Sequence, residues 1–207
     1  NYSASKASAE LVINSYQKSF FCNLDNIKLA SARAGNVIGG GDWSADRIVP
    51  DCIKSWKKNK TVALRRPSST RPWQHVLEPL SGYLQLGNKL NISKENLDGE
   101  SFNFGPDQKN IKTVEELVFT MSKEWQDSKY KINDQEPLFK EANLLQLDCA
   151  KSETLLNWVP NLDFEKAAKL TIDWYINYYN GNNIYQYSLD QINQYYDIAK
   201  EKNYDWT

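Results

Sequence analysis

A tyrosine and a lysine stand four positions apart at the start of the chain, at Tyr2 and Lys6. Residues four apart share one face of a helix, so the ammonium group of Lys6 can lie beside the phenol of Tyr2. A tyrosine that exchanges protons at neutral pH needs a pKa below its usual value of about 10, and a fixed cation nearby has that effect. The pair is therefore a candidate acid/base unit. The alternative interpretation is a solvated pair without a chemical role, because many exposed helices carry Tyr and Lys at this spacing.

Four polar residues occupy positions that suit an anionic ligand. Asn36 and Asn103 lie at the ends of predicted strands, Arg47 begins a predicted helix, and Arg71 precedes a Pro-Trp pair. A guanidinium group is a planar fork of donors that matches phosphate oxygens. If Arg47 and Arg71 face one cleft, they form a diphosphate site. The alternative is that each is an ordinary solvated charge or an ion-pair partner.

Hydrophobic periodicity and turn residues place these side chains on an alternation of helices and strands. A strand followed by a glycine-rich loop (residues 35–41) is typical of an α/β layer, in which ligands bind at the C-terminal ends of the strands. The predicted helices cover residues 4–20, 47–58, 78–90 and 114–125, and a capping box at 113–116 precedes the last of these. Later helices are capped by Asp148 and Asp163, and a second capping box at 188–191 follows a linker at 177–187. The predicted strands cover 27–33, 61–65, 73–76, 101–104 and 145–147.

Composition excludes several classes of protein. A chain of 207 residues, 41% of them hydrophobic, can bury the core of one or two domains. The net charge of −1 argues against a nucleic-acid or anionic-membrane surface, and no apolar run reaches the ~18 residues of a membrane span, which predicts a soluble protein. Cys22, Cys52 and Cys149 are far apart and His75 is the only histidine, so neither a metal cluster nor a disulfide framework is predicted, as in a reducing cytoplasm.

The start of the chain is unusual for an α/β protein. The sequence opens without an initiating Met, and a glycine-rich phosphate loop of the dinucleotide-binding type does not occur in it. The run Gly39-Gly40-Gly41 does not qualify, because Asp42 and Trp43 follow it directly. We therefore expect these residues to be the C-terminal part of a longer protein.

Five segments occur in an order that resembles a known family. They are Tyr2-x-x-x-Lys6, 33–39, 71–76, 102–105 and 147–160. Together they are similar to the extended short-chain dehydrogenase/reductases, the NAD-dependent epimerase/dehydratase family, from the catalytic tyrosine to the C-terminus. Within that family, residues 39–51 and 71–83 resemble the branch that acts on CDP-glucose. The resemblance covers nearly the whole chain; the two long segments are specific, whereas the Tyr/Lys pair and Asn36 mark only the superfamily.

The resemblance implies a role for each matching residue. Tyr2 would be the base that takes the proton of the sugar 4-hydroxyl while hydride passes to NAD, and Lys6 would bind the nicotinamide ribose and keep Tyr2 near its phenolate form. Ala34 and Val37 would also contact NAD. The implied substrate-binding residues are Asn36, Arg47, Ala63, Leu64, Arg65, Arg71 and Asn103. A metal is not implied. His75 replaces a tyrosine of many relatives and receives no role.

The implied reaction is a nucleotide-sugar 4,6-dehydration, which makes the full-length protein a lyase. Oxidation at C4 acidifies the C5 proton, water leaves across C5 and C6, and the same hydride returns to C6, so NAD is regenerated. The further acid and base lie upstream of the tyrosine in the family, so these residues alone are expected to be inactive. The resemblance also implies a cytoplasmic homodimer in deoxysugar synthesis for the O-antigen of lipopolysaccharide. The alternatives are another nucleotide-sugar dehydratase or epimerase, or a non-catalytic nucleotide-sugar-binding module.

The implied fold class is α/β, the C-terminal part of a Rossmann-type doubly wound parallel sheet plus a smaller α/β substrate-binding domain. Residues 1–37 would end the NAD-binding Rossmann domain, whose N-terminal part is absent from these residues. Residues 38–70 and 93–180 would form the substrate-binding domain, 71–92 would return to the Rossmann domain, and 181–207 would form a C-terminal tail helix.

Overall fold

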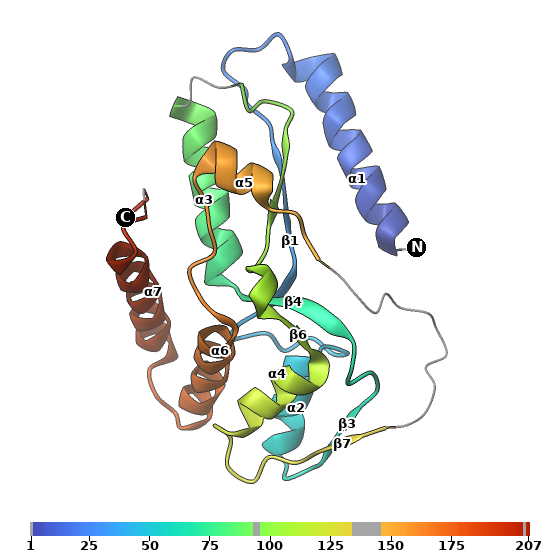
Figure 1. Cartoon of the computed structure of the whole chain (residues 1–207), viewed down its shortest axis with the longest axis vertical. Coiled ribbons are helices and arrows are strands. Elements are labelled where there is room, and N and C mark those ends of the chain that lie inside the picture. The colour runs from blue at the N-terminus through green and yellow to red at the C-terminus, as the bar shows by residue number, and fades with distance from the viewer. Residues whose placement is uncertain (1, 93–95, 134–145, 205) are drawn as a thin grey trace.

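The computed structural model describes residues 2–92, 96–133, 146–204 and 206–207 (Figure 1). Its helices are α1 (Tyr2–Tyr16), α2 (Ile48–Trp56), α3 (Leu77–Ile92), α4 (Val114–Ser122), α5 (Ala150–Leu156), α6 (Phe164–Tyr179) and α7 (Ile184–Glu201). Its strands are β1 (Ser31–Ala34), β2 (Asn36–Ile38), β3 (Val62–Leu64), β4 (Thr70–His75), β5 (Ser101–Phe104), β6 (Ile111–Thr113) and β7 (Tyr130–Ile132). The α/β fold class predicted from the sequence is confirmed.

The strands that the structure describes form three small sheets, in which parallel pairing dominates. β1 pairs with β5, β2 with β4 and β3 with β7, all in parallel, while β6 runs antiparallel to β4. The amide of Gln74 on β4 donates to the carbonyl of Phe104 at 2.9 Å and so ties the second sheet to the first. β5, which the sequence division grouped with the substrate-binding domain, therefore lies beside β1.

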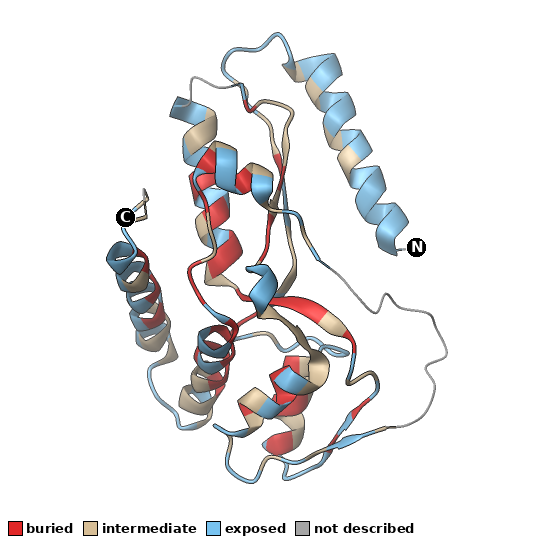
Figure 2. Cartoon of the chain, in the orientation of Figure 1, coloured by how far each residue is buried: buried red, intermediate tan, exposed pale blue. Residues whose placement is uncertain are grey.

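The buried apolar side chains of the described residues form three hydrophobic clusters, which hold the helices against the sheets and against one another (Figure 2). The largest one joins α2, α4 and α6 to β3 and β4, with Ile53, Trp56 and Ile172 among its buried members. The second joins α3 and α5 to β5 and is built around Phe102, Phe104 and Trp158. The third joins α6 to α7 through Leu170 and Tyr195. Each apolar side chain removed from water stabilises the fold by about 25 cal/mol per Å² of buried area.

Helix α1 is attached differently, through polar contacts. It is described along its whole length and buries none of its side chains. Glu10 accepts hydrogen bonds from the hydroxyls of Ser31 and Ser101, at 2.8 and 3.1 Å, and its other oxygen lies 3.7 Å from Nε of Arg33. These contacts place α1 beside the first residues of β1 and β5.

Two of the predicted helix caps, those of α4 and α6, are confirmed. Thr113 accepts from the N–H of Glu116 at 3.1 Å and the Glu116 carboxylate accepts from the N–H of Thr113 at 2.7 Å, which is the predicted capping box of α4. Asp163 caps α6 as predicted, through the N–H of Lys166 at 2.7 Å.

Four predictions for the last third of the chain were wrong: the strand at 145–147, the cap at Asp148, the linker at 177–187 and the capping box at 188–191. Gln146 and Leu147 do not form a strand, and Leu147 packs against Gly105 instead; Leu145 lies outside the described residues. Helix α5 begins after Cys149, and the carboxylate of Asp148 accepts from the N–H of Ala150, two residues on, so that Asp148 forms a turn before the helix.

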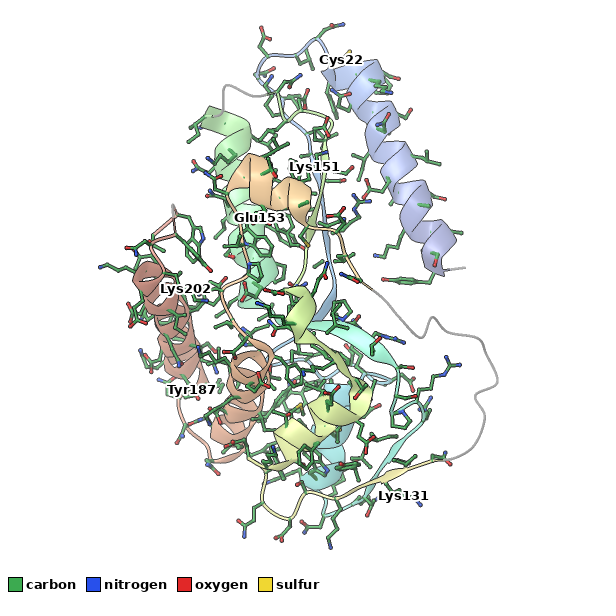
Figure 3. All side chains as sticks on the ribbon, in the orientation of Figure 1. Cys22, Lys131, Lys151, Glu153, Tyr187 and Lys202 are labelled. Atoms are coloured by element: carbon green, nitrogen blue, oxygen red, sulfur yellow. The ribbon has the colours of Figure 1, made fainter. Side chains whose placement is uncertain are left out.

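The predicted linker at 177–187 is largely helical, because α6 continues to Tyr179 and α7 begins at Ile184. Asn183 caps α7, while the hydroxyl of Ser188 donates to the carbonyl of Ile184 from within the helix. Lys202, labelled in Figure 3, reaches from the end of α7 to the carbonyl of Asn161 and helps to fasten this last helix.

Among the helices that the structure describes, none is long and apolar enough to cross a membrane. The described part of the chain also lacks any group of three or more Cys, His, Asp or Glu side chains arranged to hold a metal ion.

Candidate functional site

A cavity of about 1070 Å³ opens between the start of α1, strands β2 to β4 and the start of α2. Pockets for small ligands commonly measure 300–1,000 Å³, so this one is large enough for a nucleotide with a sugar attached. The polar and charged side chains that line it are those of Tyr2, Asn36, Asp42, Asp46, Arg47, Asp51, Arg65, Arg66, Ser69, Arg71 and Asn133.

One wall of the cavity is the pair of strands β2 and β4. Asn36 stands opposite Trp73 in the parallel register, and Arg71 lies two residues before Trp73 on the same strand. Residues two apart on a strand point to the same face, so the register brings Asn36 and Arg71 onto one surface. Arg71 is largely buried, with 8% of its surface exposed, and its Nη1 donates to the carbonyl of Thr70 at 2.8 Å. The wall therefore offers fixed hydrogen-bond donors.

A second cationic group, Arg47, directly precedes α2 and is held by Asp42. The Nη1 atom of Arg47 lies 2.9 Å from Oδ2 of Asp42, and Oδ1 of Asp42 accepts from the N–H of Ser44 at 2.9 Å. Partial burial acts to raise the pKa of Asp42, but the hydrogen bonds from Ser44 and the nearby Arg47 outweigh it and leave that pKa below its usual value. Asp42 thus stays ionised and orients Arg47.

The loop that carries Asp42 is clamped by aromatic side chains of α6. A Cβ atom on Gly40 would lie 2.0 Å from Cγ of Trp174, so only glycine allows this close approach. The hydroxyl of Tyr175 donates to the carbonyl of Asp42 at 2.7 Å, and the ring of Trp43 meets that of Tyr175 edge-on at 5.2 Å between centroids. The glycine run was predicted as a loop, but neither Asp42 nor the two α6 rings were predicted to support the site.

The predicted Tyr/Lys pair lies on α1 at the edge of the same cavity. Tyr2 lines the cavity and has 75% of its surface exposed. The Nζ atom of Lys6 lies 5.5 Å from the centroid of the Tyr2 ring, so the two side chains do share one helix face. Val37, on β2, also lines the cavity. Tyr2, Val37 and Asn36 thus line the same cavity.

Strand β3 also contributes a wall of the cavity and shows the alternation of a half-buried strand. Ala63 and Arg65 line the cavity, whereas the side chain of Leu64 lies in the hydrophobic core with 1% of its surface exposed. Only the backbone of Leu64 is available at this wall, and its carbonyl accepts from the N–H of Asn133 at 2.8 Å.

The structure brings seven of the predicted site residues to the cavity and leaves four outside its lining. Tyr2, Asn36, Val37, Arg47, Ala63, Arg65 and Arg71 line it; Lys6, Ala34, Leu64 and Asn103 are not among the described residues that do. The amide of Asn103, on β5, donates to the carbonyl of Asp148 at 2.8 Å. Asn103 therefore fixes the segment before α5 in this structure.

Sequence reasoning missed the acidic side chains of the cavity. Asp46 lies 3.3 Å from Nη2 of Arg65, and both side chains are mostly exposed. Asp51 stands in the first turn of α2, and burial, followed by the charge of Asp46, raises its pKa above the usual value. The position of Asp51 after Val49-Pro50, at the start of an amphipathic helix beside a glycine loop, was the available signal.

The fold found here is shared by solved nucleotide-sugar enzymes. The UDP-glucuronic acid 4-epimerase from Bacillus cereus matches with a TM-score of 0.70 at 18% identity, covering 85% of this chain and 52% of that one. The dTDP-glucose 4,6-dehydratase from Bacillus anthracis matches with a TM-score of 0.64 at 22% identity and covers the same shares. The described residues therefore have the Rossmann-like α/β fold of nucleotide-sugar epimerases and dehydratases.

A curated protein is similar at the level of sequence. The CDP-glucose 4,6-dehydratase from Salmonella typhimurium is 40% identical over 198 residues, which make up 94% of this chain and 55% of that protein. This chain thus spans about half the length of the curated relative that it matches. The resemblance read from the sequence is confirmed. No family model matches the chain.

Proposed function

We propose that the chain supplies the catalytic tyrosine and the substrate cleft of an NAD-dependent CDP-glucose 4,6-dehydratase. This enzyme, a lyase, converts CDP-D-glucose to CDP-4-dehydro-6-deoxy-D-glucose. The proposal depends chiefly on one observation: a single cavity collects Tyr2, Asn36, Arg47 and Arg71, the residues whose roles the resemblance assigned separately. The 40% identity to the Salmonella protein supports the choice of substrate.

The diphosphate of the substrate would lie between Arg47 and Arg71. Arg71 extends from a wall that is fixed by strand pairing, and Arg47 is fixed by Asp42, so both guanidinium groups are positioned before the ligand binds. Donors that are already ordered bind phosphate without a further loss of side-chain entropy. The amide of Asn36 would complete the contacts on the sugar side. The hexose would then extend toward Tyr2.

The residues around Tyr2 fit the nicotinamide end of NAD. The exposed phenol, the ammonium group of Lys6 one turn further on, and the apolar Val37 leave an open surface next to the cavity. Lys6 would bind the ribose hydroxyls there, with Ala34 at the end of β1 nearby. When bound, NAD would accept the C4 hydride of the sugar and later return it to C6. Tyr2 would take the proton from the 4-hydroxyl, as general-base catalysis requires.

The division into domains is part of this proposal. We assign residues 1–37 and 71–92 to the NAD-binding domain, residues 38–70 and most of 93–180 to the substrate-binding domain, and residues 181–207 to a tail helix. The pairing of β5 with β1 supports adding β5 to the NAD-binding domain. We also propose that the full-length enzyme is a cytoplasmic homodimer that serves deoxysugar synthesis for the O-antigen of lipopolysaccharide.

Thermal unfolding with three nucleotide sugars tests the substrate. CDP-glucose should raise the melting temperature of the chain more than UDP-glucose or dTDP-glucose, because a ligand that binds only the folded state stabilises it in proportion to its affinity. An equal response to all three would reduce the assignment to a nucleotide-sugar enzyme of unspecified base. If the chain unfolds cooperatively but none of the three nucleotide sugars raises its melting temperature, the proposed substrate cleft is wrong.

A further inference from the structure

Helix α1 carries Tyr2 and Lys6 but packs only one narrow face against the rest of the described chain (Figure 2). From Tyr2 to the end of the π-helical turn that follows α1, the side chains are exposed except for four that are partly buried: Glu10, Ile13, Gln17 and Phe21. Their spacing of three, four and four residues places all four on one side of the helix. The rotation of α1 about its own axis is therefore set by the contacts of this one face.

The carboxylate of Glu10 binds in a cradle formed by two strands. Ser31 on β1 and Ser101 on β5 stand opposite each other in the parallel register, and their hydroxyl oxygens lie 2.9 Å apart. Both hydroxyls donate to the same atom, Oε2 of Glu10, at 2.8 and 3.1 Å. The other carboxylate oxygen, Oε1, lies 3.7 Å from Nε of Arg33 on β1. Donors from two paired strands thus converge on a single side chain of α1.

Gln17 provides a second attachment further along the same face. Its Nε2 atom donates to Oδ2 of Asp98 at 3.0 Å, and Oδ1 of Asp98 accepts from the N–H of Leu29 at 2.8 Å. Gly99 permits this approach, because a Cβ atom there would lie 3.2 Å from Cδ of Gln17. Gln17 follows Glu10 by seven residues, about 10 Å along a helix, so the two attachments together define the tilt of α1.

The strand that holds Glu10 leads directly into the site. β1 ends at Ala34 and β2 begins at Asn36, which lines the cavity. Tyr2 lies eight residues before Glu10, about 12 Å along the helix axis. A tilt of about 5° around Glu10 would therefore move Tyr2 by about 1 Å, and a displacement of that size can lower a reaction rate about 100-fold.

We propose that Glu10 is a positioning residue for the catalytic tyrosine. Its carboxylate, held by Ser31 and Ser101, sets the distance between Tyr2 and the cavity wall formed by β2 and β4. This inference rests on the proposed function, since it takes Tyr2 as the base that acts on the sugar. Glu10 is not among the described residues that line the cavity, so its effect falls on the chemical step and not on substrate binding.

Turnover of CDP-glucose tests this role in a chimeric enzyme, in which the chain replaces the matching part of the Salmonella typhimurium dehydratase. Glu10→Ala should lower kcat about 10- to 100-fold and change KM less than about 3-fold, because a displaced base slows the reaction without removing contacts to the substrate. Glu10→Gln should keep kcat within about 3-fold, since an amide oxygen can still accept from both hydroxyls. Ser31→Ala combined with Ser101→Ala should reproduce the effect of Glu10→Ala, and this pair decides the test if Glu10→Ala does not fold.

A double substitution separates positioning from a general loss of structure. If Glu10 acts through Tyr2, adding Glu10→Ala to Tyr2→Phe should not slow the residual reaction further, whereas a general loss would slow it by the same factor again. Glu100→Ala is the matched control: Glu100 directly precedes Ser101, but its carboxylate pairs with Lys151 on α5, so kcat should not change.

Amide hydrogen exchange of the same chimeras measures the attachment without turnover. In Glu10→Ala, exchange should become faster over residues 2–16 and stay the same over α3, because only α1 loses a contact. In Glu10→Gln, exchange over residues 2–16 should stay the same.

The outcomes distinguish this inference from the function on which it rests. If the chimera is active and Glu10→Ala keeps both its kcat and its exchange rates, or slows Tyr2→Phe as much as it slows the unchanged enzyme, the inference is overturned while the proposed function stands. If the folded, unchanged chimera does not dehydrate CDP-glucose, the proposed function itself fails, and the inference fails with it.

Discussion

The carboxyl group of Glu78 gives the sharpest prediction about stability. Glu78 stands in the first turn of α3 with 1% of its surface exposed. Both of its oxygens lie 2.9 Å from the N–H of Asn161, and the hydroxyl of Tyr195 donates to one of them at 3.0 Å. Burial raises its pKa to about 7, although these donors and the charge of Lys202 act in the opposite direction.

The sign of the effect on stability follows from linkage. The pKa of Glu78 is higher in the folded chain than the 4.5 of the unfolded chain, so the folded state binds the proton more tightly. The resulting stabilisation is fully present below about pH 4.5 and is lost as the pH rises through about 7. Between pH 5 and pH 8 this difference amounts to about 2.5 kcal/mol of unfolding free energy.

His75 opposes Glu78 over the same interval. It is buried at the end of β4, and burial lowers its pKa to about 4, from 6.5 in the unfolded chain. Its contribution is therefore present above about pH 6.5 and is lost as the pH falls toward 4, which removes about 2 kcal/mol between pH 8 and pH 5. In the unchanged chain the two contributions nearly cancel, so each becomes visible only in a variant.

Urea unfolding at pH 5 and pH 8 measures both contributions. Each variant is compared with the unchanged chain at the same pH, so the cost of the substitution itself, which does not depend on pH, cancels between the two conditions. The stability of Glu78→Gln relative to the unchanged chain should be lower at pH 5 than at pH 8 by about 2.5 kcal/mol. For His75→Gln it should be higher at pH 5 by about 2 kcal/mol. If Glu78→Gln lowers the free energy of unfolding by the same amount at both pH values, Glu78 titrates as in the unfolded chain and the argument from burial is refuted.

Three further predictions concern the loop and the caps. Gly40→Ala should lower the free energy of unfolding by about 1–3 kcal/mol in urea, because its Cβ would meet Trp174 at 2.0 Å; an unchanged value would mean that the ring moves freely. Tyr175→Phe should lose about 1 kcal/mol and weaken CDP-glucose and UDP-glucose equally in calorimetry, since it releases the backbone of Asp42; a changed ratio would contradict a role at the phosphate end. Thr113→Ala should cost about 1 kcal/mol by removing the capping box, and a thermal melt identical to that of the unchanged chain would show that the cap is dispensable.

Local rules predicted the elements wherever a single interaction decides the structure. The capping box at Thr113 is such a case, because both of its hydrogen bonds lie within four residues. The similar motif at Ser188 failed because α7 already begins at Ile184, capped by Asn183, and the hydroxyl of Ser188 accepts from the indole N–H of Trp174 on the neighbouring helix. A four-residue motif carries no information about a helix from another part of the chain that packs against it.

The site residues likewise include some that could be predicted from the sequence and some that could not. Asn36 and Arg71 were named from their residue types and from the resemblance, and the parallel register of β2 and β4 places them on one face. Asp42 could not be predicted, because its position depends on Tyr175, which is 133 residues further along the chain. The burial of Leu64 follows from strand alternation, which a resemblance between sequences does not report.

Turnover in a chimeric enzyme tests the central claim most directly. The part of the Salmonella typhimurium dehydratase that this chain matches would be replaced by the chain itself, so that the remainder of that protein supplies what these residues lack. We predict that the chimera removes one water from CDP-glucose, seen by mass spectrometry, and that Tyr2→Phe slows this at least about 100-fold without weakening CDP-glucose binding to the same degree. A folded chimera that binds CDP-glucose but leaves it unchanged, or that works equally well with Phe at position 2, would contradict the account.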